Sequence, residues 1–399
     1  MRFKVTLAMV GILILSLGLS GSFGGQAAGD IILTADVYGS ISIPEDNMVL
    51  DGQGFAIIGN HDGAGLWIGS RSQVTIKNVI FRNWNAAVFA HHSSSIQFEN
   101  CTFQDNERGL DVEGYSHHIT VLNCQFENSS LFGMLLSTGD HFSVLKNTFR
   151  NNHIGCMVQI GVSDVIFEGN VVDSNWVGVY LWENCNRWQI VGNQFSKNTW
   201  RGLNIYGSAS NLVYHNNFID NAEQALDTVP EAELWYNPDI LEGNYWSDYP
   251  GRDDGSGLGK HAVAGDGIGD TDVPWANDSY PLMRPWSPVI PASITIDPKV
   301  LNKKSQGNWV TAYIELPEAY SPGNIDVTSI MLEDSIRAEL KPTAIGDFDQ
   351  DSRADLMVKF DRKALIALLG GRTGELTFKI SGRILGQPFT GSATVKVIK

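Results

Sequence analysis

A repeat of about 22 to 23 residues runs through the middle of the chain. Each unit opens on a large apolar residue, and these residues are Val74, Ile96, Ile119, Phe142, Val165 and Trp188. A second apolar residue follows seven positions later, at Phe81, Phe103, Phe126, Phe149, Val172 and Phe195. A unit this short, with period-2 segments and no helical stripe, buries its apolar side only against its neighbours. The repeat therefore predicts a solenoid of stacked β-strand units.

One fixed position in the repeat carries asparagine or cysteine. Its members are Cys101, Cys124, Asn147, Asn170, Asn193 and Asn216. Inward-facing asparagines can hydrogen-bond from unit to unit and satisfy backbone groups in the turns, and a buried cysteine behaves as a small apolar residue. We expect free thiols here and at Cys156 and Cys185. A disulfide between Cys101 and Cys124 is the alternative in an exported protein.

Glycine precedes the second strand in nearly every unit. The glycines are Gly109, Gly133, Gly155, Gly178 and Gly202. Glycine is favoured where φ is positive or where another segment approaches the backbone closely. Each unit is therefore expected to consist of two inward-facing strands that are joined by a polar turn, with a sharp or crowded bend before the second strand.

The first residues have the pattern of a secretory signal. Arg2 and Lys4 precede an uncharged apolar stretch at 5–19, and small residues follow at 25–28. The pattern predicts a signal peptide at 1–27 and export of the mature chain to the periplasm, the cell surface or the medium. An uncleaved anchor is the alternative, although the apolar run is shorter than the roughly 20 residues that span a bilayer. We expect no membrane span in the mature chain.

The negative charge belongs to the repeat region. Residues 29–290 contain 31 Asp and Glu against 12 Lys and Arg, whereas residues 291–399 contain 13 against 14. Such a field repels nucleic acid, and it disfavours polyuronate chains unless a metal ion bridges the like charges. Nucleic acid is therefore excluded as a partner, and neutral glycans or cations are favoured.

Several motifs beside the regular repeat resemble a known family. They are Val-Leu-Asp-Gly-Gln-Gly at 49–54, Gly-Asn-Tyr-Trp-Ser-Asp-Tyr at 243–249, Gly-Asp-Gly-Ile-Gly-Asp-Thr at 265–271 and Tyr-Pro-Leu-Met at 280–283. Together with the repeats, they resemble the NosD-like family of right-handed parallel β-helices, with a pectate-lyase-like solenoid. The resemblance implies an all-β chain with a parallel β-helix at 28–245 and an Asp- and Gly-rich capping loop and linker at 246–290.

The fold implied by this resemblance does not select one activity. It hosts lyases, epimerases, hydrolases, adhesins and a periplasmic protein of copper-enzyme maturation. A copper-related accessory role is implied by the family alone. It would require imidazole or soft ligands gathered at one place.

The chain changes character after Met283. A proline cluster at Pro285, Pro288 and Pro291 is followed by short alternating segments such as 309–314 and 376–380. Strands separated by Gly, Pro and Asp turns predict a small β-sandwich domain at 291–399. One short helix is expected at 363–369.

An acidic loop in this second domain has the spacing of a calcium site. The proposed ligands at positions 1, 3, 5, 7 and 9 are Asp347, Asp349, Asp351, the carbonyl of Arg353 and Asp355. Oxygen-rich ligand sets of this kind suit Ca²⁺. Ser352 replaces the usual glycine and Val358 the usual glutamate, so the loop resembles shorter extracellular calcium loops. A solvated acidic turn is the alternative.

A column of turn residues gathers histidines. Successive units present Ser95, His118, His141, Asp164 and Arg187 before the first strand. Neighbouring parallel strands lie ~4.8 Å apart, which brings these side chains within reach of one another. His118, His141 and Asp164 could hold a transition metal, or act with Arg187 as an acid-base cluster. An ordinary column of polar turns is the alternative.

A second column is expected on the outside of the strand that follows the glycines. It comprises Trp67, Phe89, Asp111, Leu135, Met157, Tyr180, Asn204 and Asp227, flanked by His91, Glu113, Gln159, Trp182 and Tyr206. Sugar rings stack on exposed aromatic rings, and their hydroxyls need polar partners. Phe89, His91, Tyr180, Trp182, Asn204 and Tyr206 are therefore candidate carbohydrate contacts. Burial beneath a loop or the second domain is the alternative.

Asp111 and Glu113 lie two residues apart on the same face, ~6.8 Å along the strand. That separation is compatible with paired-carboxylate glycoside chemistry. The sequence thus predicts a monomeric, exported β-helix protein that binds a polysaccharide, with calcium in its second domain. A polysaccharide lyase, epimerase or glycoside hydrolase, with Asp111, Glu113 and Arg187 as catalytic residues, remains open. So does the copper-related role.

Overall fold

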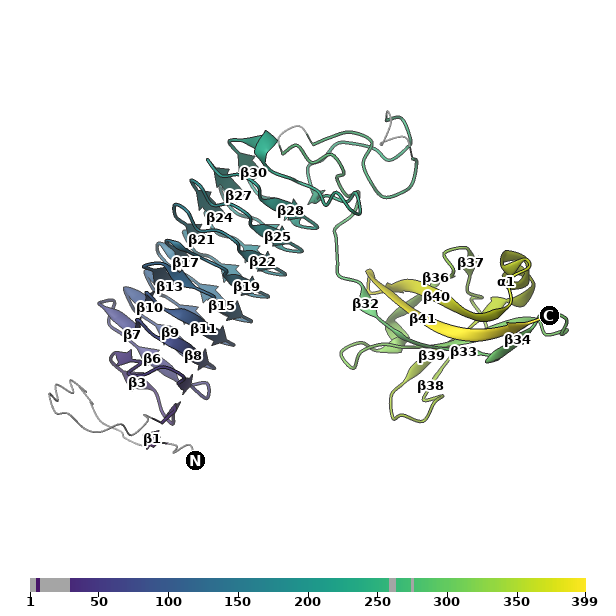
Figure 1. The fold of residues 1–399 in the computed structure, drawn as a ribbon, viewed down its shortest axis with the longest axis horizontal. Coiled ribbons are helices and arrows are strands. Elements are labelled where there is room, and N and C mark those ends of the chain that lie inside the picture. The colour runs from purple at the N-terminus through teal and green to yellow at the C-terminus, as the bar shows by residue number, and fades with distance from the viewer. Residues whose placement is uncertain (1–4, 8–28, 258–262, 274–275) are drawn as a thin grey trace. The chain divides into compact units, whose positions relative to one another are not determined.

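The computed structural model describes residues 5–7, 29–257, 263–273 and 276–399. The chain forms two compact units, Met1–Trp286 and Ser287–Lys399, each with its own hydrophobic core (Figure 1). The predicted signal peptide at 1–27 lies outside the described residues, apart from strand β1 (Val5–Leu7). Among the described residues, no helix has the length and apolarity needed to cross a bilayer.

The first unit is a right-handed parallel β-helix, as the repeat and the resemblance predict. Its strands lie in three parallel sheets. The twelve-stranded sheet contains β1, β2 (Ile31–Leu33), β5 (Val49–Asp51), β8 (Ser72–Lys77), β11 (Ser94–Glu99), β14 (Ser116–His117), β15 (Thr120–Leu122), β18 (Gly139–Asp140), β19 (Ser143–Leu145), β22 (Ile166–Glu168), β25 (Gln189–Val191) and β28 (Leu212–Tyr214).

The other two sheets of the β-helix have ten and nine strands. The ten-stranded sheet contains β3 (Val37–Tyr38), β6 (Ala56–Ile58), β9 (Ile80–Arg82), β12 (Thr102–Gln104), β16 (Gln125–Glu127), β20 (Thr148–Arg150), β23 (Val171–Asp173), β26 (Gln194–Ser196), β29 (Asn217–Ile219) and β31 (Tyr245–Trp246). The nine-stranded sheet contains β4 (Ile41–Ser42), β7 (Ala64–Gly69), β10 (Ala86–His91), β13 (Arg108–Glu113), β17 (Phe132–Leu136), β21 (Ile154–Val158), β24 (Val177–Trp182), β27 (Arg201–Tyr206) and β30 (Glu223–Asp227).

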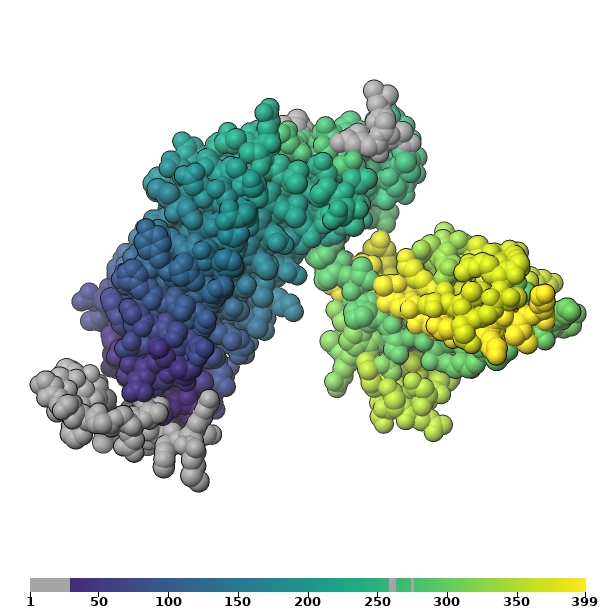
Figure 2. All heavy atoms as spheres, viewed as in Figure 1, coloured from purple at the N-terminus to yellow at the C-terminus, as the bar shows by residue number. Residues whose placement is uncertain are grey.

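A regular turn of the β-helix contributes one strand to each of the three sheets, and β14 and β18 are short additional strands of the twelve-stranded sheet. The prediction of two strands per unit was therefore wrong. The predicted first strand is split, for example into β11 and β12, by Asn100 with φ of 52°. A residue in the left-handed region bends the chain, and asparagine tolerates that region better than most residues do. The space-filling view shows the colour changing evenly from purple to teal along this unit, because each turn packs against the turns next to it in sequence (Figure 2).

The recurring glycines are the second residues of strands in the nine-stranded sheet, and crowding requires them there. A Cβ atom on Gly109 would lie 2.3 Å from the carbonyl oxygen of Gly133, and one on Gly178 would lie 2.3 Å from that of Gly202. No side chain can occupy that space without moving the backbone of the next turn. The predicted crowding is therefore confirmed, and positive φ is not the reason for these glycines.

Buried asparagines link the turns, as the sequence predicts. Asn147 Nδ2 donates to the carbonyl oxygen of Val121 at 2.9 Å, and its backbone N–H donates to Asn170 Oδ1 at 2.8 Å. The same contacts recur at Asn170, Asn193 and Asn216. A second buried ladder, which the sequence analysis missed, comprises Asn152, Asn175, Asn198 and Asn221. The four cysteines are buried free thiols.

The segment after β31 closes the carboxy-terminal end of the β-helix. The first asparagine ladder passes through Asn244 to the buried carboxylate of Asp278, which also accepts the indole N–H of Trp246 at 2.9 Å. Burial raises the pKa of Asp278 to about 6, against the effect of these donors. Polar groups at the end of the ladder are thus paired inside the cap and do not face an open core.

The second unit contains a six-stranded and a four-stranded sheet and fits the predicted β-sandwich. The six-stranded sheet contains β32 (Ile290–Pro291), β34 (Val300–Asn302), β36 (Ile325–Leu332), β37 (Ile336–Arg337), β40 (Gly374–Ile384) and β41 (Gln387–Ile398). The four-stranded sheet contains β33 (Ser293–Asp297), β35 (Trp309–Glu315), β38 (Ala344–Gly346) and β39 (Asp355–Asp361). The predicted short helix is α1 (Arg362–Leu369), whose N-terminal N–H groups are capped by Asp361.

Candidate functional site

The outer face of the nine-stranded sheet carries the predicted column of side chains. In register from turn to turn lie Trp67, Phe89, Asp111, Leu135, Met157, Tyr180, Asn204 and Leu226. The prediction is confirmed except for its last member, because Asp227 pairs with Ile205 instead. Asp227 is buried in the cap and accepts the indole N–H of Trp235 at 3.2 Å. Within the β-helix unit, no described strand or helix packs over this face (Figure 1).

Aromatic rings occupy the amino-terminal part of this face. Trp67 is 50% exposed and stacks on Phe89 with ring centroids 4.8 Å apart. Phe89 in turn stacks on His91 at 5.9 Å. Rings in register along a parallel sheet therefore form a flat apolar surface with polar edges.

Asp111 is the most unusual group on the face, because it is a carboxylate with no exposed surface. Its Oδ2 accepts from Arg108 Nη1 at 2.5 Å, and its Oδ1 has no hydrogen-bond partner in the part of the chain that the structure describes. Arg108 is itself held by Asn85 Oδ1 at 2.8 Å. Burial raises the pKa of Asp111 to about 6; Arg108 opposes this shift and Glu113 adds to it. The geometry supplies a carboxyl group that can be protonated near neutral pH.

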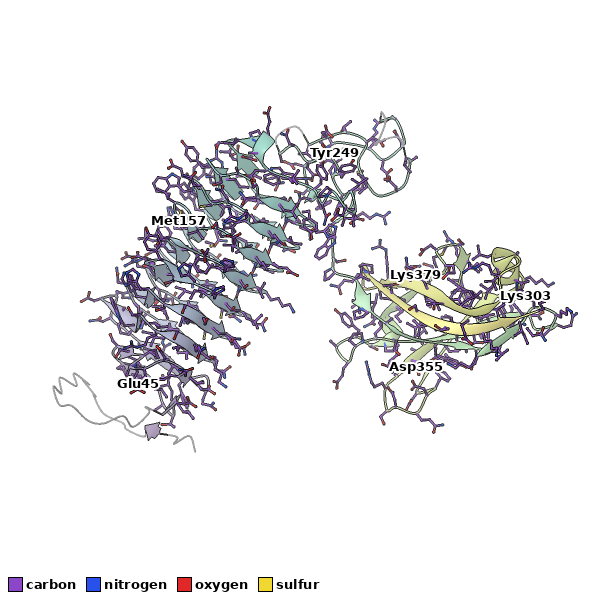
Figure 3. The ribbon with its side chains drawn as sticks, in the orientation of Figure 1. Glu45, Met157, Tyr249, Lys303, Asp355 and Lys379 are labelled. Atoms are coloured by element: carbon purple, nitrogen blue, oxygen red, sulfur yellow. The ribbon has the colours of Figure 1, made fainter. Side chains whose placement is uncertain are left out.

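An apolar patch fills the centre of the face. Its buried members are Leu135, Ile154, Met157 and Val177, and Phe132, Tyr180 and Trp200 pack against them. Met157 is labelled at the outer edge of the β-helix (Figure 3). Side chains that point away from the β-helix core are therefore packed together here, which forms a firm apolar floor beside the polar groups.

A ladder of stacked rings borders this patch, and the sequence analysis missed it. His153 stacks on Trp176 with centroids 4.5 Å apart, Trp176 stacks on Trp200 at 4.6 Å, and the guanidinium of Arg201 lies 4.3 Å from the Trp200 ring centroid. Each ring belongs to the residue two positions before a recurring glycine. Alignment of that position in the repeat could have revealed the ladder.

The predicted carbohydrate contacts at the carboxy-terminal part lie together. Trp182 and Tyr206 are paired in register and are 39% and 44% exposed. Asn204 is paired with Tyr180 and is only 2% exposed, and no described residue donates a hydrogen bond to its Oδ1. The face thus combines exposed rings with two buried acceptor oxygens that have no partner, those of Asp111 and Asn204.

Arg187 does not join the other two predicted catalytic residues. It precedes β25 of the twelve-stranded sheet, and its Nε and Nη2 donate hydrogen bonds to the Asp164 carboxylate, both at 2.6 Å. Asp111 and Glu113 lie on β13 of the nine-stranded sheet. Asp111, Glu113 and Arg187 were predicted together as catalytic residues, but Arg187 lies at a corner beside a different sheet from the other two.

The predicted histidine column exists, with a carboxylate that the sequence analysis missed. Ser95, His118, His141, Asp164 and Arg187 share φ values of 54° to 58° at one corner. The His118 and His141 rings have centroids 4.9 Å apart, and Asp140 Oδ1 lies 2.7 Å from His117 Nδ1 and 2.8 Å from His141 Nδ1. These contacts leave both Nε2 atoms uncommitted. Among the described residues, however, His118, His141 and Asp164 do not bring three donor atoms within 4.8 Å of one another.

The acidic loop of the second unit does bring carboxylates together. Two groups have oxygens within 4.8 Å of one another: Asp347, Asp349 and Asp355, and Glu315, Asp349 and Asp351. Asp355 is labelled near this loop (Figure 3). Burial raises the pKa values of Asp355 and Glu315, and the neighbouring aspartates raise them further.

Glu315 is the member that the sequence analysis missed, because it comes from β35, far away in the chain. Its carboxylate pairs with Arg353 Nη1 at 2.6 Å. Asp347, by contrast, already accepts the backbone N–H groups of Asp351 and Ser352. The loop is thus folded around its own carboxylates, and whether it takes an ion stays a prediction.

The chain belongs to a known family. The sequence profile of the family described as periplasmic copper-binding protein (NosD) matches residues 30–201 and 199–251, which is more than half of the chain. This match confirms the family that the motifs resemble. No curated protein matches the chain by sequence.

Several solved structures resemble the chain in fold. They include the A-module of the mannuronan C-5 epimerase AlgE6 of Azotobacter vinelandii (17% identity, 52% of this chain and 60% of that chain, TM-score 0.42). A mutant of the periplasmic alginate epimerase AlgG is a second example, with 11% identity, coverage of 52% of this chain and 61% of that chain, and a TM-score of 0.42. The enzymatically active domain of tailspike protein 2 of bacteriophage CBA120 is a third, with 11% identity, coverage of 92% of this chain and 62% of that chain, and a TM-score of 0.36. Similarity at this level concerns the fold alone, and the chain spans less than two thirds of each of these three.

The raised pKa of Asp111 predicts a specific pH dependence of stability. Its pKa is 3.8 in the unfolded chain and about 6 in the folded chain, so the stability that protonated Asp111 contributes is present below pH ~4 and is lost as pH rises through 6. Relative to Asp111→Asn, the unmutated protein should lose on the order of 2–3 kcal/mol of unfolding free energy between pH 4 and pH 7. Urea unfolding across this range measures the difference.

Thr120→Val, which removes no ionisable group, serves as the control for this measurement. The difference in unfolding free energy between Thr120→Val and the unmutated protein should not change with pH. Parallel pH profiles for Asp111→Asn and the unmutated protein would contradict the assignment of a raised pKa to Asp111.

Proposed function

We propose that this chain is an exported β-helix protein of the periplasm or cell surface that binds a polysaccharide along the outer face of its nine-stranded sheet. The observation that carries the proposal is the combination of exposed rings and unpaired acceptor oxygens on one flat face. Trp67, Trp182 and Tyr206 offer exposed rings, and Asp111 and Asn204 offer the oxygens. Rings bind the C–H faces of sugars, while hydroxyl and amide groups donate to acceptors.

The arrangement fits a chain-like ligand better than a small molecule. The column runs from turn to turn of the β-helix, so contacts repeat at the ~4.8 Å spacing of parallel strands. A small-molecule site is normally concave and encloses its ligand, whereas no described strand or helix of the β-helix unit packs over this face (Figure 1). The net acidity of the β-helix favours a neutral or cationic polysaccharide over a polyuronate.

Trp182→Ala tests the binding face. Loss of one stacking ring should remove ~1–2 kcal/mol, which is about tenfold in affinity, from binding to the polysaccharide identified by a glycan array. Trp309→Ala is a matched control, because Trp309 is 40% exposed on β35 of the second unit whereas Trp182 is 39% exposed. Equal affinities of both variants and the unmutated protein would contradict the proposal.

Acid catalysis on the same face is a second candidate, and Asp111 favours it. A carboxyl group with a pKa of about 6 can protonate a glycosidic oxygen near neutral pH, and Glu113, ~6.8 Å along the strand, could serve as its partner. A lyase or epimerase is less well supported, because Arg108 is engaged with Asp111 and Asn85. A hydrolase would release new reducing ends from bound polysaccharide, and a binding protein would release none.

The family description supplies a third candidate, transition-metal binding at the histidine corner. Asp140 contacts the Nδ1 atoms of His117 and His141, and this is how a carboxylate commonly orients imidazoles that bind a metal through Nε2. Imidazole suits copper and zinc. His117, His141 and the neighbouring His118 would supply the ligands, and because no three donor atoms of this corner lie within 4.8 Å of one another among the described residues, their rings would have to turn toward the ion. Metal bound there would neutralise part of the acidic field.

His141→Asn tests this third candidate, since asparagine tolerates the positive φ of 57° at this position. The unmutated protein should bind about one equivalent of Cu(II) or Zn(II), and the variant should bind at least tenfold more weakly because it loses one ligand. His61→Asn is the control, because His61 is also exposed with positive φ. Unchanged metal affinity in His141→Asn would exclude the site.

We also propose that the acidic loop of the second unit binds calcium. Carboxylates that raise one another's pKa values gain from a bound cation, and oxygen ligands suit Ca²⁺. Titration calorimetry should give a Kd on the order of 10⁻⁴ M. Asp349→Asn should abolish binding, because Asp349 belongs to both carboxylate groups. The exposed Glu375→Gln on β40 should bind normally. An Asp349→Asn titration that matches the unmutated protein would contradict this site.

A further inference from the structure

Asn204 places an unpaired acceptor at the carboxy-terminal part of the outer face. The residue is 2% exposed, and its Oδ1 has no hydrogen-bond partner among the described residues. A buried acceptor without a donor destabilises the folded state. A hydrogen bond from a ligand to this oxygen would therefore contribute more binding free energy than the same bond to a solvated oxygen.

The surroundings of Asn204 offer few other partners. Its neighbours in register are Tyr180 and Leu226. The nearby cation, Arg201, is already paired with Glu223 and lies against the ring of Trp200. The unpaired oxygen thus lies among rings and apolar groups at the end of the apolar patch formed by Leu135, Ile154, Met157 and Val177.

Asn204 lies on the outer side of its sheet, because its neighbours Leu203 and Ile205 both point into the β-helix core. Its strand, β27, lies between β24 and β30, and within the β-helix unit no described element packs over this sheet. Trp182 and Tyr206, which flank it, are 39% and 44% exposed. A ligand on this side of the sheet therefore meets side chains, and no further backbone layer of the β-helix unit, on its way to Asn204.

We propose that this part of the face selects a neutral polysaccharide with N-acetylated amino-sugar units, an inference that rests on the proposed polysaccharide binding. The acetamido N–H donates to Asn204 Oδ1, and the acetamido methyl lies against the apolar patch. A hydroxyl at the same position also donates, but its oxygen lone pairs would lose water beside an apolar patch that has no donors for them.

Charge excludes the closest chemical alternatives. A uronate would meet the acidic field of the β-helix. A free amino sugar carries an ammonium group, which the acidic field attracts, but at this position the group would lose water on the apolar patch with one neutral acceptor in return. The N-acetyl group has the same position on the sugar ring, no charge, one donor and one methyl group. It matches one buried acceptor beside an apolar surface.

Three β-1,4-linked tetramers that differ only at the second carbon of each sugar separate these possibilities. They are the tetramers of N-acetylglucosamine, glucosamine and glucose, titrated into the full chain by calorimetry. We expect the N-acetylglucosamine tetramer to bind at least tenfold more tightly than the other two. Asn204→Leu should weaken its binding about tenfold and weaken binding of the glucose tetramer by a clearly smaller factor.

Asn204→Leu should fold, because it replaces an unpaired buried polar group with an apolar group of similar size. Asn204→Ala is the second variant, and Gln125→Leu, an exposed position on the ten-stranded sheet, is the control for added apolar surface. Circular dichroism verifies the fold of each variant.

Equal binding of the three tetramers, or equal weakening of all three by Asn204→Leu, would overturn the selectivity and leave polysaccharide binding intact. Selective binding of the N-acetylglucosamine tetramer that survives in both Asn204 variants would overturn the role of Asn204. If no polysaccharide binds and Trp182→Ala changes nothing, the proposed function fails as well, and this result is distinct from the first two.

Discussion

Buried asparagine side chains that bond each turn of the β-helix to the next are the interaction on which the rest of the structure depends. Asn170, for example, donates to the carbonyl oxygen of Val144 in the previous turn and to Asn193 Oδ1 in the following one. Each ladder asparagine is buried at a corner of the β-helix, where backbone groups such as the Val144 carbonyl would otherwise lack partners. Because the ladders supply these partners, the three sheets keep the same register from turn to turn, and the side chains on their outer faces align in columns.

This alignment makes a surface from residues that are far apart in the chain. Asp111, Tyr180 and Asn204 belong to different turns, yet one column of the nine-stranded sheet holds all three. The face can combine rings, an apolar patch and buried acceptors, because the outside of a β-helix does not have to form the main core. The acidic field of the unit then acts on whatever approaches this face, and it favours ligands without negative charge.

The sequence predicted the columns better than the corners. Spacing alone aligned Tyr180 with Asn204 and Trp182 with Tyr206, since a period fixes register directly. It did not reveal that Asn100 splits one expected strand into two. For the same reason it grouped Arg187 with Asp111, although the three-sheet cross-section separates them. In the second unit, local spacing found Asp347, Asp349 and Asp355 and missed Glu315, which an antiparallel pairing of distant strands brings to the loop.

The repeat by itself determined the parallel β-helix, its inward asparagines and the side chains available on each face, because stacked units of constant length have one register. The tertiary structure decided which polar side chains are buried and which groups bond or stack with one another. It showed that Asp111 and Asn204 keep oxygens without partners, that His153, Trp176 and Trp200 stack, and that Arg187 is occupied by Asp164. Desolvation and hydrogen bonding depend on atoms contributed by several turns at once, and no single stretch of sequence specifies them.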